Sequence, residues 1–442
     1  MASRSIPPAR LLAYGGPILG LSFLLFFVQF YFLKFATDVL LLSPALVGWM
    51  FALAKLWDAV SDPLVGGWSD RSRSRFGRRR PFLLAALPLL VAGYAMLWSP
   101  PLGLGDGALI AWAAAGLFVF YTAFTLYTLP HVALGAELSR DSHQRTRLFA
   151  SRQMSFTIGM LVAFAAIQVA MNAAAPREMA ARIAVPSARV AVALRATGPL
   201  AVREPVSPGR SGGRSLVAGL RDVFRNPPAR LLLFVQFVEA VGVGAVGTMA
   251  PFVAQYVLGR PEIVGTLPAA YVIAGVVSIP IWVRVSRAAG KRNTWLCAML
   301  LAASAFGGML FLGAGDVLPM VLLLVLAGSA MGCGSVMSPS ILADIIDGDE
   351  RRTGERKEGV YAASLTFMLK LGTSLATAAS GMVLSAVAFE PNVEQSERSL
   401  LGIRLLFAGM PCAGFLIGAL LFSRIVLEPP PAAAVAGAGE RE

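Results

Sequence analysis

The sequence predicts an all-α membrane protein with about twelve transmembrane helices in two six-helix bundles, and three observations lead to this fold class. Of the 442 residues, 56% are hydrophobic and only 14% are charged, whereas about 25% of the residues of a soluble domain are charged. Apolar runs of the roughly 20 residues needed to cross hydrocarbon recur along almost the whole chain. A polar stretch bearing Pro and Gly divides these runs into two sets of similar number.

The backbone of each span must satisfy its own hydrogen bonds inside the membrane, so the spans are expected to be helices. We expect them to begin near residues 12, 43, 81, 107, 150, 179, 229, 264, 292, 316, 360 and 401. Residues 1–202 are then an N-terminal six-helix bundle, 203–228 a cytoplasmic linker, 229–426 a C-terminal six-helix bundle and 427–442 a disordered tail. The polar opening lacks a cleavage site, so the first span is expected to be retained.

Most spans are plain apolar runs, but several carry polar residues that need a reason. The first ends with Lys34, which is expected at the membrane interface. The sixth, about 179–202, holds Arg182, Arg189 and Arg195 where apolar residues are expected. A cavity-facing arginine, a shifted span or a local error in the sequence would each explain this pattern.

The net charge of +13 is arranged as a topology signal. Basic residues gather in alternate loops, at 71–80, 140–147, 284–292 and 351–357, while the loops between them are acidic. By the positive-inside rule, the basic loops and both termini are expected in the cytoplasm of a multi-pass cell-membrane protein, with the bacterial inner membrane favoured. Nucleic acid is therefore not an expected partner, the lipid bilayer is, and we expect a monomer. The three cysteines lie in apolar spans and predict no disulfide or metal site.

The second span contains two acids, Asp58 and Asp62, within an apolar stretch. A charge near the bilayer centre costs at least about 2.5 kcal/mol, so such acids persist where they face a wet cavity or bind an ion. Their spacing of four places both on one helix face. Two carboxylates that repel each other are relieved by a cation or a proton, so this pair predicts a cation site. A structural pair neutralised by Lys55 or a neighbouring helix is the alternative.

Two long motifs resemble a known family. The first covers residues 55–63 (KLWDAVSDP) with Gly66, Asp70-Arg71, residues 74–78 (SRFGR) and Arg80-Pro81; the second covers residues 343–347 (ADIID) and 353–359 (TGERKEG), in the loop expected before the eleventh span. Together they resemble the signatures of the glycoside-pentoside-hexuronide:cation symporters, a branch of the major facilitator superfamily that includes melibiose permease. The resemblance runs from about residue 14 to 423 and implies the major facilitator fold and transport of a solute with a coupling cation, Na⁺ or H⁺.

The resemblance also implies roles for individual residues. Cation ligands would be Asp58, Asp62, the intervening Ser61 and Thr125 of the fourth span. Residues for the solute or for coupling would be Lys370 of the eleventh span, facing the acidic pair, and Arg152 at the start of the fifth span, together with the positions Ser22 and Thr128. Glu239, in the middle of the seventh span, is a further candidate from its placement alone. Thr125 and Thr128 could instead bond to carbonyls of their own helix.

The departures from the family pattern concern the solute. Positions that read a galactoside with aspartates and a tryptophan in melibiose permease align with Ser22, Thr128 and Val132. An aspartate and a tryptophan bind a sugar by charged hydrogen bonds and by stacking. The cation machinery is thus expected to be kept while the solute differs.

The polar loops suggest a gate. Asp70, Arg71 and Arg78 after the second span, and Asp344, Asp347 and Arg356 before the eleventh, could pair with acids and helix ends and separate when the transporter opens. Binding of anionic lipid is the alternative for the arginines.

The predicted function is a cation-coupled secondary transporter, of a sugar or glycoside, that works by alternating access. No nucleophile with its base, metal cluster or phosphate loop is visible in the sequence, so an enzyme is not expected and no cofactor beyond the coupling cation is predicted. The alternatives are the same fold moving a lipid-like or organic-acid solute, and a membrane sensor that transports nothing.

Overall fold

The computed structural model describes residues 7–72, 74, 77–138, 141–201, 221, 223–354 and 358–425, with side chains throughout except at 70, 136–137, 142–143 and 194–201. In these ranges every regular element is a helix. The elements are α1 (Pro8–Asp38), α2 (Pro44–Arg71), α3 (Arg80–Trp98), α4 (Asp106–Glu137), α5 (Ser142–Met171), α6 (Pro176–Ala201), α8 (Pro227–Phe252), η1 (Val253–Val257), η2 (Pro261–Ile263), α9 (Thr266–Met309), α10 (Val317–Thr353), α11 (Glu358–Ala386), α12 (Glu397–Arg404), η3 (Leu405–Gly409) and α13 (Met410–Phe422).

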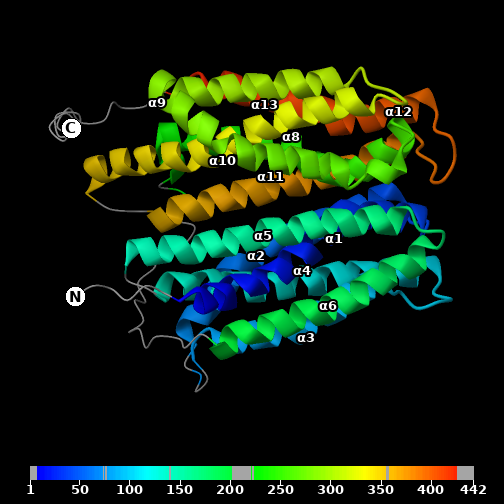
Figure 1. Ribbon diagram of the computed structural model, residues 1–442, viewed down its shortest axis with the longest axis horizontal. Coiled ribbons are helices and arrows are strands. Elements are labelled where there is room, and N and C mark those ends of the chain that lie inside the picture. Colours follow the sequence, from blue (N-terminus) through cyan, green and yellow to red (C-terminus); the bar gives the residue numbers. More distant parts are fainter. Residues whose placement is uncertain are drawn as a thin grey trace.

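The long helices lie side by side along one axis (Figure 1). Gly290 has φ 78°, outside the helical range, and breaks α9 into two spans. The short π-helices η1 and η3 continue their neighbours, so α8 with η1, and α12 with η3 and α13, are each one rod. The predicted all-α fold with about twelve spans is therefore confirmed.

Among the described helices, nine are long and apolar enough to cross a membrane, with α9 counted once. Of the long helices, α2 and α6 fall short of this criterion, because their charged residues lower the hydropathy. Both are as long as the helices beside them.

The helices form two groups that follow the chain order. In the first, α1 contacts α5 and α6, α3 contacts α4 and α6, and α2 contacts α4; in the second, α8 contacts α11 and α13, and α9 contacts α10 and α13. Figure 1 shows α1 to α6 on one side and α8 to α13 on the other. Most of the predicted linker, 203–220 and 222, and the predicted tail, 427–442, lie outside the described residues.

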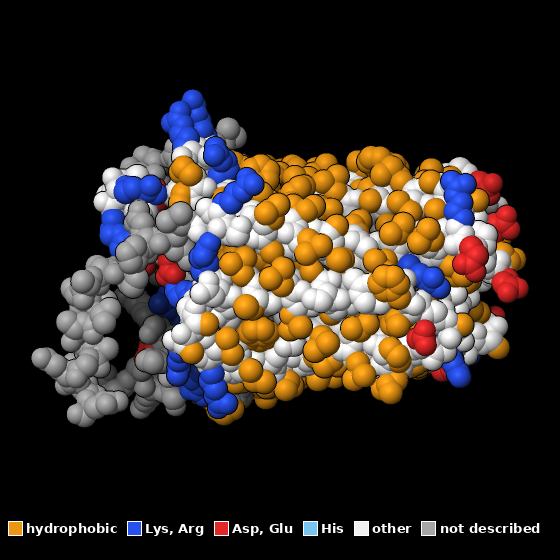
Figure 2. Space-filling model, turned by 90° about the horizontal axis from the view of Figure 1, so that it is seen from above, with side chains coloured by type: hydrophobic (Ala, Val, Ile, Leu, Met, Phe, Trp, Pro, Cys, Tyr) orange, Lys and Arg blue, Asp and Glu red, His pale blue; other side chains and the backbone are white. Residues whose placement is uncertain are grey.

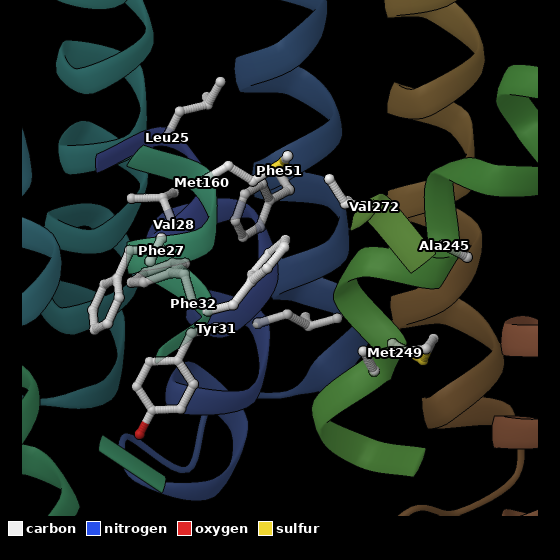
Figure 3. Close-up of a cluster of buried hydrophobic side chains, with 14 of the residues drawn as sticks. Leu25, Phe27, Val28, Tyr31, Phe32, Phe51, Met160, Ala245, Met249 and Val272 are labelled. Atoms are coloured by element: carbon white, nitrogen blue, oxygen red, sulfur yellow. The ribbon is translucent and has the colours of Figure 1, made fainter. Parts of the chain in front are cut away.

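Aromatic side chains fill the first group. Trp98 of α3 contacts four rings of α1, among them Phe27 with ring centroids 4.6 Å apart and Phe35 at 5.0 Å. Figure 3 shows Phe27, Tyr31 and Phe32 of α1 near Phe51 of α2. Such edge and offset contacts add to the packing of buried rings.

The second group meets the first along α2 and α11. Gly48 and Gly381 lie so close that a Cβ on Gly381 would be 2.2 Å from the Pro44 carbonyl oxygen. The hydroxyl of Ser374 donates to the carbonyl oxygen of Ala52 at 2.6 Å, and the backbone N–H of Ala45 donates to Ser385 Oγ at 3.0 Å. Small residues thus let the two groups touch through their backbones.

Charge divides the ends of the molecule. Figure 2 shows Lys and Arg crowded at one end, where α2 ends and α3 begins, and Asp and Glu gathered at the other. We call these the basic end and the acidic end; the acidic end includes Asp38, Asp316 and Glu390. This separation agrees with the alternation of loops in the sequence.

Two sequence predictions need correction, and one of the alternatives left open for the sixth span is excluded. The fifth helix begins at Ser142 rather than near 150. Hydropathy did not reveal this start, because the first turns of the helix are polar. Helix α10 continues to Thr353, so Asp344 and Asp347 lie on a helix and not in a loop; the helix ends where Gly354 takes φ 69°. Arg182 and Arg189 are exposed on the outside of α6, so neither faces a cavity.

Lys34, expected at the membrane interface, is 3% exposed and lies close to the acidic end of the molecule, one turn before the end of α1. It forms an ion pair with Asp38 one turn later. The pairing explains its burial, since a buried base is tolerated where an acid meets it.

Candidate functional site

The two acids of the second span lie on one face of α2, directed toward α4 and α11. Asp58 is 6% exposed, and Asp62 is partly exposed. Helix α2 is held against α4 by Trp57, whose Nε1 donates to Thr122 Oγ1 at 2.9 Å and whose ring lies 4.7 Å from that of Phe118. This packing fixes the direction in which the next residue, Asp58, points.

Oxygen atoms from two helices surround the acids. The hydroxyl of Thr125 donates to Asp58 Oδ1 and lies 3.4 Å from Asp62 Oδ1. The hydroxyl of Ser61 donates to the carbonyl oxygen of Asp58 at 3.1 Å and is 3.5 Å from Thr125 Oγ1. The four residues predicted to hold the cation therefore lie together, with the hard oxygen donors that Na⁺ prefers.

Lys370 of α11 lies between the two acids. Its Nζ is 2.7 Å from Asp58 Oδ2 and 2.5 Å from Asp62 Oδ2, and its side chain is 25% exposed. The other nearby base, Lys55, is 8% exposed and donates to Thr377 Oγ1 at 2.8 Å. One ammonium thus serves two carboxylates, which leaves the trio with an excess negative charge when both acids are ionised.

The predicted solute residues of the N-terminal group do not join this cluster. Ser22 is buried and its hydroxyl bonds to the carbonyl oxygens of Ile18 and Leu19, both at 3.0 Å. The hydroxyl of Thr128 donates to the Phe124 carbonyl oxygen at 2.7 Å. Both hydroxyls are thus satisfied within their own helices, the alternative foreseen for intramembrane threonines.

Arg152 and Glu239 also lie apart from the acids. Arg152 lies well inside α5 rather than at its start, because that helix begins earlier than predicted. Its Nε is buried and makes no hydrogen bond to the described part of the chain. Glu239 of α8 faces the interior of the second group, beside Tyr271 and Gln236. Neither residue is brought to Lys370.

The predicted gating residues are spread over the basic end. Arg71 is exposed, Arg78 is half-buried, and Asp347 is exposed on α10. Asp344 pairs with Lys291 at 2.7 Å, which joins α10 to α9 within the second group and does not bridge the two groups. The side chain of Asp70 and the whole of Arg356 lie outside the described residues.

A cavity of about 480 Å³, here the central cavity, opens between the two groups. Its walls are mostly aromatic and aliphatic, with Phe26, Phe30 and Phe164 on one side and Gly244, Gly247 and Phe407 on the other. Lys55, Leu369 and Thr373 also line it, so the cavity lies next to the residues that flank Lys370. The sequence alone did not identify these wall residues, since apolar side chains on a membrane helix carry no signal of a cavity.

Sequence reasoning also did not predict a polar network at the acidic end. Asp38 of α1 accepts a hydrogen bond from Tyr256 Oη at 2.8 Å, and its carbonyl oxygen accepts one from Asn392 Nδ2 at 2.8 Å. Lys34 Nζ lies 4.3 Å from the Tyr256 ring centroid and 4.8 Å from that of Phe252, within range of a cation–π interaction. This network, which we call the acidic-end clasp, joins the first group to the second. The spacing of Lys34 and Asp38 by four was the available signal, but their partners are far away in sequence.

Comparison with known proteins identifies the family. The model of the family described as MFS/sugar transport protein matches residues 13–428. The chain belongs to this family. The resemblance drawn from the two motifs is thereby confirmed, and the protein is a multi-pass membrane transporter rather than an enzyme.

Its relatives match over nearly the whole chain. An uncharacterized symporter of Synechocystis sp., sll1374, is 25% identical, and the match covers 93% of this chain and 92% of that protein. The isoprimeverose transporter of Lactiplantibacillus pentosus is 26% identical over 91% of this chain and 86% of its own. The glucuronide carrier protein homolog of Escherichia coli is 25% identical over 88% and 85%.

Solved structures agree on the fold. A bacterial homolog of the human lysosomal transporter Spinster, in an inward-facing and unoccupied conformation, has a TM-score of 0.70 at 15% identity, covering 96% of this chain and 100% of that chain. A D-xylose-proton symporter has a TM-score of 0.66 at 16% identity, covering 94% and 96%. At these identities the likeness establishes the major facilitator fold alone.

Proposed function

We propose that the protein is a symporter that couples the movement of Na⁺ or H⁺ to that of a sugar or glycoside. The observation that carries this proposal is the cluster of Asp58, Asp62, Thr125 and Lys370, in which two acids of a membrane-spanning helix share one base. The names of the relatives, which include an isoprimeverose transporter and a glucuronide carrier homolog, support a sugar or glycoside as the solute.

In the cation-free state the ammonium of Lys370 takes the place of the cation. It neutralises part of the charge of Asp58 and Asp62 and holds α11 against α2. An arriving cation is bound by carboxylate and hydroxyl oxygens and displaces the lysine, whose partial exposure lets it swing away. With a proton in place of Na⁺, protonation of one carboxyl weakens the same ion pairs.

This exchange gives coupling without covalent chemistry. Lys370 is on α11 of the second group and the acids are on α2 of the first, so release of the lysine changes the contact between the groups that must move. We place the solute in the central cavity. Thr373, one turn after Lys370, lines this cavity, so the exchange takes place beside the solute. A site near the interface of two halves suits alternating access. The coupling is reciprocal, so bound solute also raises the affinity for the cation.

We further propose that the basic end faces the cytoplasm of a bacterial cell, following the positive-inside rule. All the residues of the site come from one chain, so a monomer suffices.

The test is uptake into proteoliposomes that contain the purified full-length protein. Labelled mono- and disaccharides, with a lysophospholipid and a dicarboxylic acid for comparison, are offered with an imposed gradient of Na⁺, Li⁺ or H⁺. We expect at least one sugar to accumulate above its external concentration only under a cation gradient. The proposal is overturned if every sugar merely equilibrates, or if only the lipid or the acid accumulates.

A further inference from the structure

A second cavity, of about 370 Å³, lies within the C-terminal group, and we call it the C-terminal cavity. It is enclosed by α8, α9, α10, α11 and α13. It shares Ala240, Val243, Tyr271 and Leu369 with the central cavity, so the two adjoin. Its described lining includes no residue of α2, so a site here is separate from the acids that are proposed to hold the cation.

Glu239 of α8 brings a carboxyl group to this cavity. The side chain is partly exposed, but its Oε1 atom is buried and makes no hydrogen bond to the described part of the chain. None of the described residues that line the cavity is Lys, Arg or His, so no base there neutralises the acid. An isolated carboxylate in apolar surroundings is very costly, and a neutral carboxylic acid costs far less.

Most hydrogen-bond donors beside Glu239 are already engaged. Gln236 Nε2 donates to Ser338 Oγ, and the hydroxyl of Ser335 donates to the carbonyl oxygen of Gly332 at 2.8 Å. The Tyr271 hydroxyl is buried and makes no hydrogen bond among the described residues, so it is available to the acid. A carboxylate is stabilised by two or three donors, and a single hydroxyl falls short of that number.

The helices packed around Glu239 bring no charged group to it among the described residues. Tyr271 of α9 and Cys333 of α10 interact with it electrostatically, and both side chains are ordinarily neutral at pH 7. Helices α11 and α13 line the cavity with Leu365, Leu369 and Phe415. These surroundings favour a carboxyl group that carries its proton.

A proton fits this site better than a metal cation does. A hard cation needs several oxygen ligands, which α2 and α4 supply as two carboxylates and two hydroxyls. Beside Glu239 the Tyr271 hydroxyl is free, whereas Ser338 Oγ already accepts from Gln236. One carboxyl group with one free hydroxyl holds a proton but does not enclose a cation.

The position of Glu239 also allows the proton to leave. Part of the side chain faces the C-terminal cavity, which has room for several waters at roughly 30 Å³ each. Tyr271 lines both cavities, so this water can reach the central cavity. Loss of the proton leaves a carboxylate that needs more donors than the walls supply, so ionisation opposes the packing of α8 against its neighbours.

We propose that Glu239 is a proton-binding site of the C-terminal group, separate from the cation site on α2. The acid holds its proton while the cavity walls are packed as described. In alkaline solution it releases the proton to cavity water and the packing of this group loosens. The consequence for transport rests on the proposed function: uptake at saturating Na⁺ requires a proton on Glu239.

Infrared spectroscopy of the purified full-length protein tests the site without any solute. A protonated carboxyl group gives a carbonyl band that a carboxylate lacks. We expect this band at neutral pH, with a shift in D₂O and loss in alkaline solution. Glu239→Gln should remove it, and Glu239→Leu serves the same purpose should that variant not fold. Asp62→Asn and Glu262→Gln, the latter at an exposed acid, should both keep it.

Transport gives a second measurement. Uptake is followed under a saturating Na⁺ gradient, with equal pH on both sides of the membrane, from neutral to alkaline solution. Once Glu239 ionises, uptake by the wild type should fall by up to about tenfold for each further pH unit. Glu239→Gln keeps the shape of the neutral acid and does not ionise, so it should retain its uptake in alkaline solution.

The inference is overturned if the wild type shows no carbonyl band at neutral pH, or if Asp62→Asn rather than Glu239→Gln removes the band. It is also overturned if Na⁺ removes the band at constant pH, or if Glu239→Gln keeps the wild-type pH profile. The proposed function stands in each of these cases, because accumulation of a sugar under a cation gradient is measured separately. If no sugar accumulates, the proposed function fails, and the infrared result still decides the proton site.

Discussion

At the scale of single residues, the site depends on which oxygen atoms face the acids. The sequence predicted Asp58 and Asp62 from physical grounds alone, because acids in an apolar helix need a reason. Physical reasoning did not separate Thr125 from Thr128, two threonines on one helix, since either hydroxyl can bond to its own backbone; only the family resemblance assigned Thr125 to the cation and Thr128 to the solute. The structure separates them: Thr125 donates to Asp58, and Thr128 donates to Phe124. Glu239 was predicted because it lies in the middle of an apolar span, but neighbours such as Tyr271 belong to other helices and could not be predicted.

Thr125→Ala tests this distinction. It removes a hydrogen bond to a charged group, worth about 1.5–3 kcal/mol, so the cation concentration for half-maximal uptake should rise roughly tenfold or more. Thr128→Ala is the matched control and should change it little, because the lost bond is internal to α4. The measurement is uptake against cation concentration. Equal effects of the two substitutions would remove Thr125 from the site.

Lys370→Ala tests the role of the shared base. Without its ammonium, the empty carrier holds Asp58 and Asp62 with no counter-charge between them. We expect net uptake to fall at least tenfold, because the cation-free carrier no longer reorients across the membrane to bind the next solute. Exchange of labelled for unlabelled solute, which does not need this step, should persist. Lys291→Ala, at an exposed lysine paired with Asp344, is the control. A Lys370→Ala variant with fully coupled uptake would leave this lysine a packing role only.

At the scale of helices, most elements could be predicted because the membrane demands long apolar runs. The predicted starts of α2, α3 and α4 lie within a residue of those observed. The errors fall where helices extend into water, at the polar first turns of α5 and the charged last turns of α10, because hydropathy gives no boundary there. Close packing of α2 on α11 could not be predicted, since it depends on two glycines, Gly48 and Gly381, that are far apart in the sequence.

Gly381→Val tests this packing. A Cβ at this position already lies 2.8 Å from Gly48 Cα and 2.2 Å from the Pro44 carbonyl oxygen, so valine must push α2 and α11 apart. In a background without native cysteines, the labelling rate of Met50→Cys, now 9% exposed, should rise severalfold. Gly66→Val, where a Cβ meets nothing within 4 Å, is the control and should leave the rate unchanged. An unchanged rate in Gly381→Val would show that this contact does not hold the groups together.

At the scale of the whole molecule, the two groups of helices meet at the acid–lysine cluster, along α2 and α11, and at the acidic-end clasp. The clasp ties Asp38 of α1 to Tyr256 of η1 and to Asn392, so opening of the acidic end must break these bonds. Alternating access then requires that the contacts of the clasp and those of the acid–lysine cluster each break and re-form during one transport cycle. The number of helices and the separation of basic from acidic loops could be predicted from the sequence, but long-range pairs such as Asp38 with Tyr256 have no local signature.

Tyr256→Phe tests the clasp. It removes the hydroxyl that donates to Asp38 and accepts from the backbone N–H of Asn392 at 3.0 Å, and it keeps the ring beneath Lys34. With spin labels at the exposed positions Leu41 and Val393, the population with a long interlabel distance should increase. Tyr14→Phe, whose hydroxyl bonds within the first group, is the control. A distance distribution identical to that of the wild type would contradict a gating role.

The most direct test of the central claim compares two kinds of transport in Asp58→Cys and Asp62→Cys. In proteoliposomes with matched amounts of inserted protein, the account predicts that each variant loses accumulation driven by a cation gradient. Movement of solute down its own gradient should remain. Accumulation at the wild-type level in both variants would contradict the claim that a cation binds between these two acids.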